Sequence, residues 1–482
     1  MIFAGFTFLF RFLPIVLIAY ILCPKQFRNG LLFLASLIFY AWGEPVYVLL
    51  MLFSTVSDYW HGRQIDAARR AGKQKKAKGF LISSIVINIA MLGFFKYADW
   101  LIGIWNGVTG SHVPLLALPL PLGISFYTFQ TMSYSIDVYR GEAKVQKNII
   151  DFGMFVSLFP QLIAGPIVRY ADIEAQMKER PLSAGRMSEG AQRFAVGLAK
   201  KVLLANQFGF LWETITATPP AEMPVLTGWL GIIAYGLQIY YDFSGYSDMA
   251  IGLGAIFGFH FPENFDHPYE SRSVSEFFRR WHMTLQKWFA SYVYYPLGGN
   301  RKGLRRQIGN LLVVWALTGI WHGASGNFLA WGLYFACWLI LEKVFLQKAL
   351  KRAPRVVGHL YTLVVVAFGW VLFTHTNLLE AGQYMARMLA IPLRTAGGTA
   401  QAAGAGLGGG LYSAGTWYYL FQYGGLLLLG ALGATNLPVC LAKKLKLCGK
   451  KWISAVFIAC MLLLCTAYLV DASYNPFLYF RF

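Results

Sequence analysis

The sequence predicts an all-α protein that crosses a membrane many times. Of its 482 residues, 57% are hydrophobic and only 13% are charged, whereas about a quarter of the residues are charged in a typical soluble domain. Apolar stretches recur along the whole chain, and several approach the ~20 residues that a helix needs to cross a bilayer. These stretches are residues 30–52, 80–96, 228–241, 310–321, 328–341, 356–373, 417–434 and 453–470.

From these stretches we expect roughly ten to twelve spanning or half-spanning helices, the range reflecting the usual error in helix boundaries. No segment has the polar composition and the ~100–150-residue length of an independent soluble domain. We therefore expect a single integral-membrane domain over residues 1–482. The first stretch, 1–23, has Arg11 inside its apolar run and no small-residue cleavage site, so it is predicted to be a membrane helix and not a cleaved signal.

Basic residues are concentrated in alternate loops. The basic loops are residues 61–79, with seven Lys or Arg, and 169–201, 300–306, 343–355 and 443–451. The loops between them have two Lys or Arg at most and are 99–121, 212–228 and 374–416. By the positive-inside rule, the basic loops face the cytoplasm and both chain ends lie outside. The net charge of +20 is thus explained by a protein face next to anionic lipid, and not by binding to nucleic acid. Affinity for an acidic donor is an additional role of the same face.

Polar side chains inside apolar segments are costly, which makes each one a candidate functional residue. One such segment contains Asp242, Ser244 and Asp248. Ser244 and Asp248 are four residues apart and would share one face of a helix. For the two aspartates we expect mainly a structural role, bracing the core or pairing with Arg279 or Arg280.

The stretch from Glu276 onward is predicted to form one amphipathic helix. Its charged residues lie off an apolar stripe, beside which His282 is found. Because it carries too many charges to cross lipid exposed, it is expected at the cytoplasmic interface or as a re-entrant piece lining a cavity. The stripe consists of Phe277, Trp281, Leu285, Trp288 and Tyr292.

Two histidines lie in aromatic surroundings, His282 in "RRWH" and His322 in "WHG". A structural hydrogen bond is the ordinary role of a buried histidine. The chemical alternative is a general base, because imidazole titrates near pH ~6.5 and burial keeps it neutral and able to accept a proton. A hydroxyl is the obvious group to deprotonate. No cluster of His, Cys and carboxylates has the spacing of metal ligands, so neither a metal nor a bound cofactor is expected.

Five blocks of the chain, in order, resemble the membrane-bound O-acyltransferase family, and most of all the bacterial branch that serves alginate O-acetylation and teichoic-acid D-alanylation. The blocks are "PLGISFYTFQTMSYSIDVYRGE" (121–142), "FPQLIAGPIVRY" (159–170), "YYDFSGYSDMAIGLG" (240–254), "FFRRWHMTLQKWFASYVYYPLGGNR" (277–301) and "LTGIWHGASGNFLAWGLYF" (317–335). The ending "YNPFLYFRF" (474–482) resembles that of the alginate-type members.

This resemblance implies helices arranged around a central tunnel, in which an acyl group moves from a thioester to a hydroxyl. His322 matches the near-invariant histidine of the family and would be the general base. His282 matches the second polar catalytic position and would orient the acceptor or donate to developing charge. The supporting positions are Asp242, Asp248, Arg279, Arg280, Trp281, Trp321 and Asn327.

The resemblance also implies a place and partners. We expect a multi-pass protein of the plasma (inner) membrane that takes acetyl groups from cytoplasmic acetyl-CoA, or an acyl-carrier thioester, for O-acetylation of an exported polysaccharide. A secreted SGNH-type acyltransferase is the expected partner. D-alanyl transfer from a carrier protein to a cell-wall polymer is the alternative within the same enzyme class. Transport is the alternative outside it, and the lack of internal sequence repeats disfavours transport.

Tyr479, in the C-terminal "FLYFRF", is a candidate acyl relay. It would accept the acyl group with His322 as base and pass it on to the secreted partner. An aromatic anchor at the membrane interface is the alternative role for this tyrosine.

Overall fold

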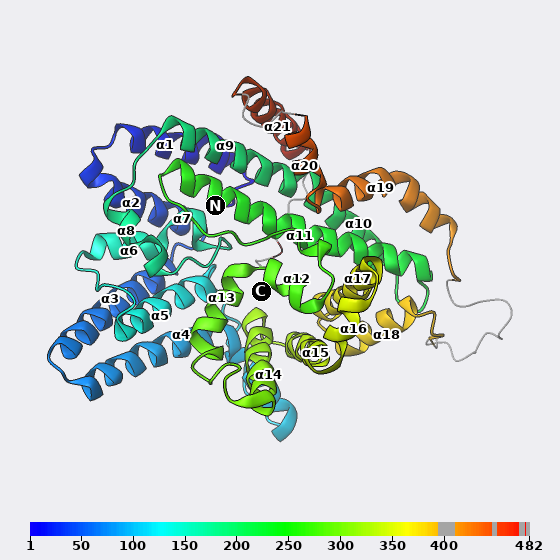
Figure 1. Cartoon of the computed structure of the whole chain (residues 1–482), viewed down its shortest axis with the longest axis horizontal. Helices are drawn as coiled ribbons and strands as arrows, with labels where there is room; N and C mark the ends of the chain where they lie inside the picture. The colour runs from blue at the N-terminus through cyan, green and yellow to red at the C-terminus, as the bar shows by residue number, and fades with distance from the viewer. Residues whose placement is uncertain (394–409, 446–450, 472–477, 479–482) are drawn as a thin grey trace. The chain divides into compact units, whose positions relative to one another are not determined.

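The computed structural model describes residues 1–393, 410–445, 451–471 and Leu478, and over these residues the secondary structure is helical throughout (Figure 1). The predicted all-α fold is confirmed. The chain divides into two compact units, Met1–Leu198 with Tyr246–Glu263, and Ala199–Gly245 with Asn264–Phe482. Helix α11 (Val225–Ile256) contributes residues to both.

In the first unit, α3 packs against both α4 and α5. A buried polar network stabilises this packing, because the carboxylate of Asp58 on α3 accepts hydrogen bonds from Ser84 (2.5 Å) and Asn88 (2.7 Å) on α4. The helices of this unit are η1 (Phe8–Phe12), α1 (Leu13–Leu22), η2 (Lys25–Phe27), α2 (Arg28–Ala41), α3 (Val48–Arg70), α4 (Gln74–Thr109), α5 (Ile124–Arg140), α6 (Ile149–Ser157), α7 (Phe159–Leu162), α8 (Tyr170–Lys178) and α9 (Ala184–Ala199).

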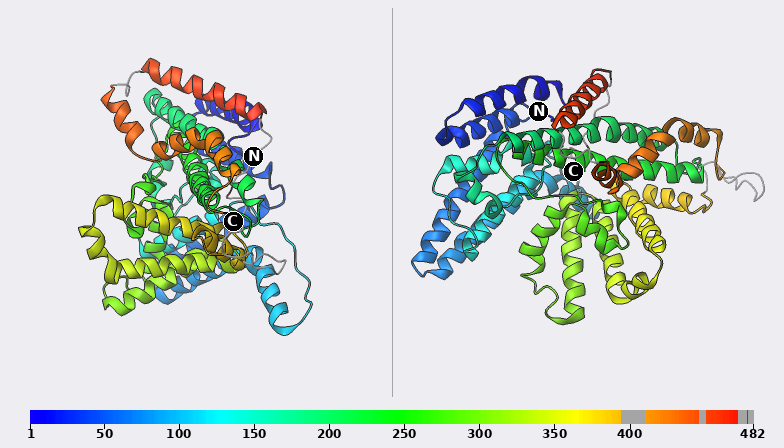
Figure 2. Two further views of the ribbon diagram at one scale, coloured as in Figure 1. Left: turned by 90° about the vertical axis from the view of Figure 1, so that its right-hand side faces the viewer. Right: turned by 45° about the horizontal axis from the view of Figure 1, so that its top comes forward.

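In the second unit, α15 packs against both α14 and α17, and α12 packs against α15 and α17 (Figure 2). The helices of this unit are η3 (Lys200–Ala205), α10 (Asn206–Thr216), η4 (Pro268–Glu270), α12 (Val274–Arg280), α13 (Met283–Phe289), η5 (Ala290–Tyr294), α14 (Gly303–His322), α15 (Gly326–Leu341), η6 (Glu342–Leu346), α16 (Gln347–Arg352), α17 (Arg355–Thr374), α18 (Leu378–Met388), α19 (Ala414–Gly433), α20 (Leu437–Lys444) and α21 (Lys451–Asp471).

Two glycines allow α14 and α15 to approach each other closely. A Cβ at Gly319 would collide with the carbonyl of Phe328, and a Cβ at Gly332 would collide with the carbonyl of Trp315. Small residues at such contacts let helix backbones pack tightly where lipid removes the hydrophobic drive to associate. This contact fixes the end of α14, where His322 lies.

Within the described residues, five helices are long and apolar enough to cross a membrane, or six if the bent pair α19 and α20 counts as one span. The five are Gln74–Thr109, Ala184–Thr216, Gly326–Arg352, Arg355–Thr374 and Trp452–Asp471. The expected ten to twelve included half-spanning helices; the described residues also contain the shorter apolar helix Phe8–Leu22. The protein is a multi-pass membrane protein, and the sidedness of its loops stays a prediction.

The single amphipathic helix predicted from Glu276 onward is wrong. The structure has two short helices, α12 and α13, separated at His282, whose backbone is left-handed (φ 44°, ψ 54°). The preceding segment satisfies the backbone at the break, since Asp266 N donates to Arg280 O (3.0 Å) and Met283 N donates to Asn264 O (2.9 Å). These bonds offset the ~1–2 kcal/mol that a left-handed conformation costs a residue with a Cβ.

Candidate active site

His322 is the last residue of α14 and is buried in an aromatic cage. The centroid of its ring lies 5.0 Å from Trp321, 5.0 Å from Trp331 and 5.2 Å from Phe373. These rings come from α14, α15 and α17, so the packing of three helices fixes the cage. An imidazole in such a cage is shielded from water, as chemistry that competes with hydrolysis requires.

His282 is held by Asn264. Its Nδ1 lies 2.9 Å from Asn264 Oδ1, which also accepts from Thr284 Oγ1 (2.9 Å) and from the backbone N–H of Thr284 (3.4 Å). A backbone N–H can only donate, so the shared Asn264 atom is the amide oxygen. Nδ1 of His282 therefore carries the proton, and Nε2 carries the lone pair.

Nε2 of His282 is buried and makes no hydrogen bond to any described residue. Burial lowers the pKa of His282 to about 3, because the interior disfavours the charged imidazolium. The ring is thus neutral near pH ~7 and presents a hydrogen-bond acceptor. Of the two roles expected for His282, a ring with its lone pair at Nε2 suits orienting the acceptor better than donating to developing charge.

The two histidines share one neighbour. The ring centroid of Trp321 lies 6.2 Å from that of His282 and 5.0 Å from that of His322. His282 also meets Phe243 of α11 edge-on at 4.7 Å. Residues forty positions apart in the chain are thereby brought to one aromatic cluster in the second unit.

Two other predicted positions support this cluster. Asn327 is buried, and its Nδ2 donates to the carbonyls of Leu372 (3.2 Å) and Phe373 (3.4 Å), which ties α15 to the end of α17 beside the cage. Trp281 is buried as well and stacks on Phe277 at 5.5 Å. Both residues position the aromatic walls.

The charged candidates have partners other than those expected. Asp242 pairs with Lys201 (2.7 Å), and Asp248, in the first unit, pairs with Arg193 (2.9 Å). The predicted pairing of the aspartates with Arg279 or Arg280 is therefore wrong. Lys201 and Arg193 belong to the helical segment that precedes α11 along the chain, and no spacing in the sequence indicates that packing.

The two arginines lie elsewhere on α12. Arg280 pairs with Glu276 (3.0 Å) and approaches Glu270 (3.8 Å). Arg279 is exposed and lines a separate pocket.

Leu478 lies against α11. Leu478 is buried, and its backbone N–H donates to Asp242 Oδ2 (3.0 Å). Asp242 thus binds both Lys201 and Leu478. Tyr479, the candidate relay, follows Leu478 in the sequence and lies outside the described residues.

Sequence reasoning missed Asn264 and Trp331. The role of Asn264 depends on a tertiary contact and has no local signature. The indole N–H of Trp331 is buried without a hydrogen-bond partner among the described residues, and its ring contacts His322. An unused donor next to the candidate base can stabilise developing negative charge.

No group of three or more His, Cys, Asp or Glu in the described part of the chain could hold a metal ion. The site consists of imidazoles, indoles and an amide. The chemistry that these groups can perform is proton transfer and hydrogen bonding away from water.

A polytopic helical membrane protein with two buried histidines at one aromatic cluster is suited to acyl transfer between a thioester and a hydroxyl. Residues 42–380 match the model of the membrane-bound O-acyltransferase family. The chain belongs to this family and is a membrane O-acyltransferase.

Several relatives are similar over most of the chain. A probable alginate O-acetylase of Pseudomonas aeruginosa is 42% identical over 387 residues, which are 78% of this chain and 73% of the relative. A peptidoglycan O-acetyltransferase of Helicobacter pylori is 33% identical over 430 residues, 80% of this chain and 79% of the relative. The teichoic acid D-alanyltransferase of Bacillus subtilis is 26% identical over 337 residues, 63% of this chain and 80% of the relative.

Proposed function

We propose that this O-acyltransferase takes an acetyl group from a cytoplasmic thioester, acetyl-CoA or an acyl-carrier thioester, and delivers it for O-acetylation of an exported polysaccharide. The names of the relatives support this proposal: two are O-acetylases of alginate or peptidoglycan, and the D-alanyl-transferring relative is less similar. The basic loops assigned to the cytoplasm suit an anionic donor.

The observation that carries the mechanism is the arrangement of His282 and His322 around Trp321. The acceptor hydroxyl has one proton, so it donates its hydrogen bond to His322, while Nε2 of His282 accepts from a second N–H or O–H group of the bound substrates and holds them in place. His322 removes the hydroxyl proton as the oxygen attacks the carbonyl carbon. The C–S bond then breaks, and the leaving thiolate takes the proton back from His322.

Each group that acts on the substrates contributes a rate factor of known size. A placed general base adds typically ~10²–10⁴-fold to the rate. The indole N–H of Trp331 is the nearby donor suited to the oxyanion, and loss of one such donor costs ~10²–10³-fold in other acyl-transfer enzymes. Because a thioester is already activated, these two contributions and the exclusion of water account for the chemistry required.

Tyr479 is proposed as an intermediate acceptor that hands the acetyl group to a secreted SGNH-type acyltransferase. The contact of Leu478 with Asp242 supports this role, because Asp242 adjoins Phe243, whose ring meets His282. The alternative is an aromatic anchor for the chain end. Residues 1–482, which include both compact units, are proposed to act as one functional domain.

The decisive experiment is reconstitution of the purified protein in proteoliposomes with either acetyl-CoA or a D-alanyl carrier protein, each labelled in its acyl group. Label that moves from acetyl-CoA to the protein or to a polysaccharide supports the proposal. Label transferred only from the D-alanyl carrier would replace it with the alternative within the same class.

A further inference from the structure

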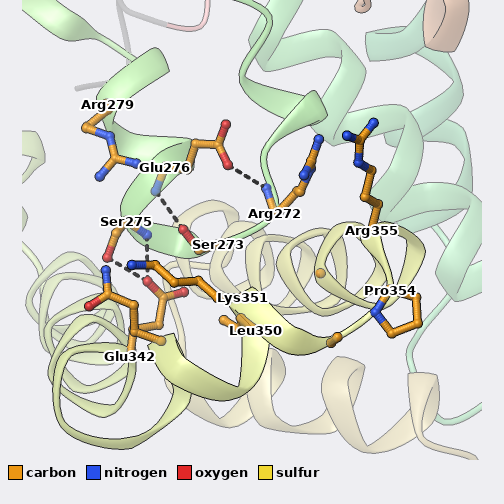
Figure 3. A pocket seen from close by; sticks show the side chains of 13 residues that line it. Arg272, Ser273, Ser275, Glu276, Arg279, Glu342, Leu350, Lys351, Pro354 and Arg355 are labelled. Atoms are coloured by element: carbon orange, nitrogen blue, oxygen red, sulfur yellow. Dashed lines mark hydrogen bonds between the residues drawn. The ribbon is translucent and has the colours of Figure 1, made fainter.

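A pocket in the second unit contains more positive charge than its surroundings neutralise. It has a volume of about 560 Å³ and lies where α12, the end of α16 and the start of α17 meet (Figure 3). A cavity of this size is within the ~300–1,000 Å³ typical of small-molecule sites. Four cationic side chains line it, namely Arg272, Arg279, Lys351 and Arg355.

The carboxylates of the pocket have other partners. Glu342 accepts from the backbone N–H groups of Val274 (2.5 Å) and Ser275 (2.9 Å) and from the Ser275 hydroxyl (2.6 Å), so it caps the start of α12. Glu276 pairs with Arg280 (3.0 Å) and accepts from the backbone N–H of Arg272 (3.0 Å).

None of the four cations forms an ion pair with a described residue. Even with both carboxylates counted, the lining keeps a net charge of +2, from four cations and two anions. Figure 3 shows Arg272 and Arg355 extending in the same direction although they come from different elements. A guanidinium group matches the oxygens of a phosphate better than a single point charge does.

The pocket also lies at the boundary between two candidate membrane spans. It is lined by Ala353 and Pro354, which separate the two candidate spans Gly326–Arg352 and Arg355–Thr374. On the predicted topology this boundary is cytoplasmic. Phosphate is the anion found there in two forms, the headgroups of anionic lipids and the phosphates of a nucleotide-bearing donor.

We propose that this pocket is a phosphate-binding site that takes a phosphomonoester or phosphodiester group on the cytoplasmic side. Helix α12 links the site to the histidine cluster along the chain, because it carries Glu276 and Arg279 and ends two residues before His282. A donor's phosphates would bind here while its thioester reaches the histidines, and an anionic lipid headgroup would instead hold α12 in place. The first source rests on the proposed function, whereas the phosphate site itself does not.

The test uses two double variants of equal charge on neighbouring positions. Lys351→Gln with Arg355→Gln removes two cations that line the pocket. Lys348→Gln with Arg352→Gln removes two exposed cations of α16 that do not line it. If the pocket double variant fails to fold, Arg279→Gln alone replaces it, because Arg279 is exposed and has no ion pair among the described residues.

Two probes distinguish the sources. Adenosine 3′,5′-bisphosphate is titrated calorimetrically into the protein in phosphatidylcholine nanodiscs. Retention of phosphatidylglycerol is measured by native mass spectrometry after extraction from vesicles that contain about 20% of this lipid. For one of the two probes, we expect the pocket variant to show roughly tenfold lower affinity or retention than the wild type, because two charge-assisted contacts are lost. The control variant should match the wild type.

Loss of nucleotide binding assigns the site to a donor, and loss of lipid retention assigns it to a headgroup. Wild-type protein that binds neither probe, or pocket and control variants that behave alike, would overturn the proposal. Neither readout requires acyl transfer, so failure of the phosphate site and failure of the proposed acetyl transfer remain separate results.

Discussion

His282 donates a hydrogen bond from Nδ1 to Asn264 Oδ1 over 2.9 Å, and this bond leaves Nε2 as the ring nitrogen whose lone pair is available for chemistry. Asn264 Oδ1 also accepts a hydrogen bond from the Thr284 hydroxyl, and the backbone carbonyl of Asn264 accepts one from the Met283 N–H. Asn264 therefore fixes both the tautomer of His282 and the break between α12 and α13. In catalytic terms, Asn264 is a positioning residue.

Asn264→Asp should make activity sensitive to acid. In the wild type, burial keeps the pKa of His282 at about 3, so the ring is neutral throughout an ordinary assay range. A carboxylate in place of the amide favours the imidazolium and raises that pKa. As pH falls through the raised pKa, Nε2 gains a proton and loses its lone pair, so activity should fall at low pH and recover at high pH.

The measurement is kcat against pH for wild type, Asn264→Asp and Thr284→Val. The last variant removes one hydrogen bond to Asn264 without adding charge and should keep the wild-type profile. An unchanged profile in Asn264→Asp would show that the lone pair of His282 is not used.

Gly332→Ala should destabilise the contact between α14 and α15. The new Cβ would collide with the carbonyl of Trp315, and backbone atoms cannot yield as a flexible side chain can. Overpacking of this kind costs typically ~1–3 kcal/mol. Thermal unfolding in nanodiscs should show a lowered midpoint. Gly326→Ala on the same helix is the control, since nothing lies within 4 Å of the position that its Cβ would take; equal midpoints for the two variants would contradict the packing argument.

The orientation in the membrane can be tested with single cysteines in a cysteine-free background. Cysteines at Lys75 and Lys348 should react with a membrane-impermeant maleimide only after the cells are opened, because both positions lie in basic loops. A cysteine at Gly408, which lies outside the described residues, should react in intact cells. Labelling of position 75 from outside would reverse the assignment of every loop.

Tyr479→Phe distinguishes a relay from an anchor. The variant keeps the aromatic ring and removes only the hydroxyl, so an anchor should tolerate it, whereas a relay should lose all transfer to the polysaccharide. Mass spectrometry of the C-terminal peptide after incubation with donor should find one added acetyl group in the wild type. Normal polysaccharide acetylation by the variant would exclude the relay.

The sequence predicted the fold class and the aromatic surroundings of each of the two histidines, since apolar length and aromatic neighbours are local properties. The predictions from the sequence were wrong where contacts between distant parts of the chain determine the local structure. The apolar stripe through Trp281 is continuous, yet hydrogen bonds from the Asn264 segment break the helix at His282. The partners of Asp242 and Asp248 were wrong for the same reason: Lys201 and Arg193 reach them only through the packing of separate helices.

The central claim is that His322 is the base of acyl transfer, and its most direct test is the single-turnover rate of His322→Ala with labelled acetyl-CoA in proteoliposomes. His260→Ala, an exposed histidine outside the cluster, is the matched control. We predict wild-type folding for both variants, a wild-type rate for the control and a rate at least ~10²-fold lower for His322→Ala, the minimum expected of a base. A well-folded His322→Ala that keeps more than about a tenth of the wild-type rate would contradict the mechanism.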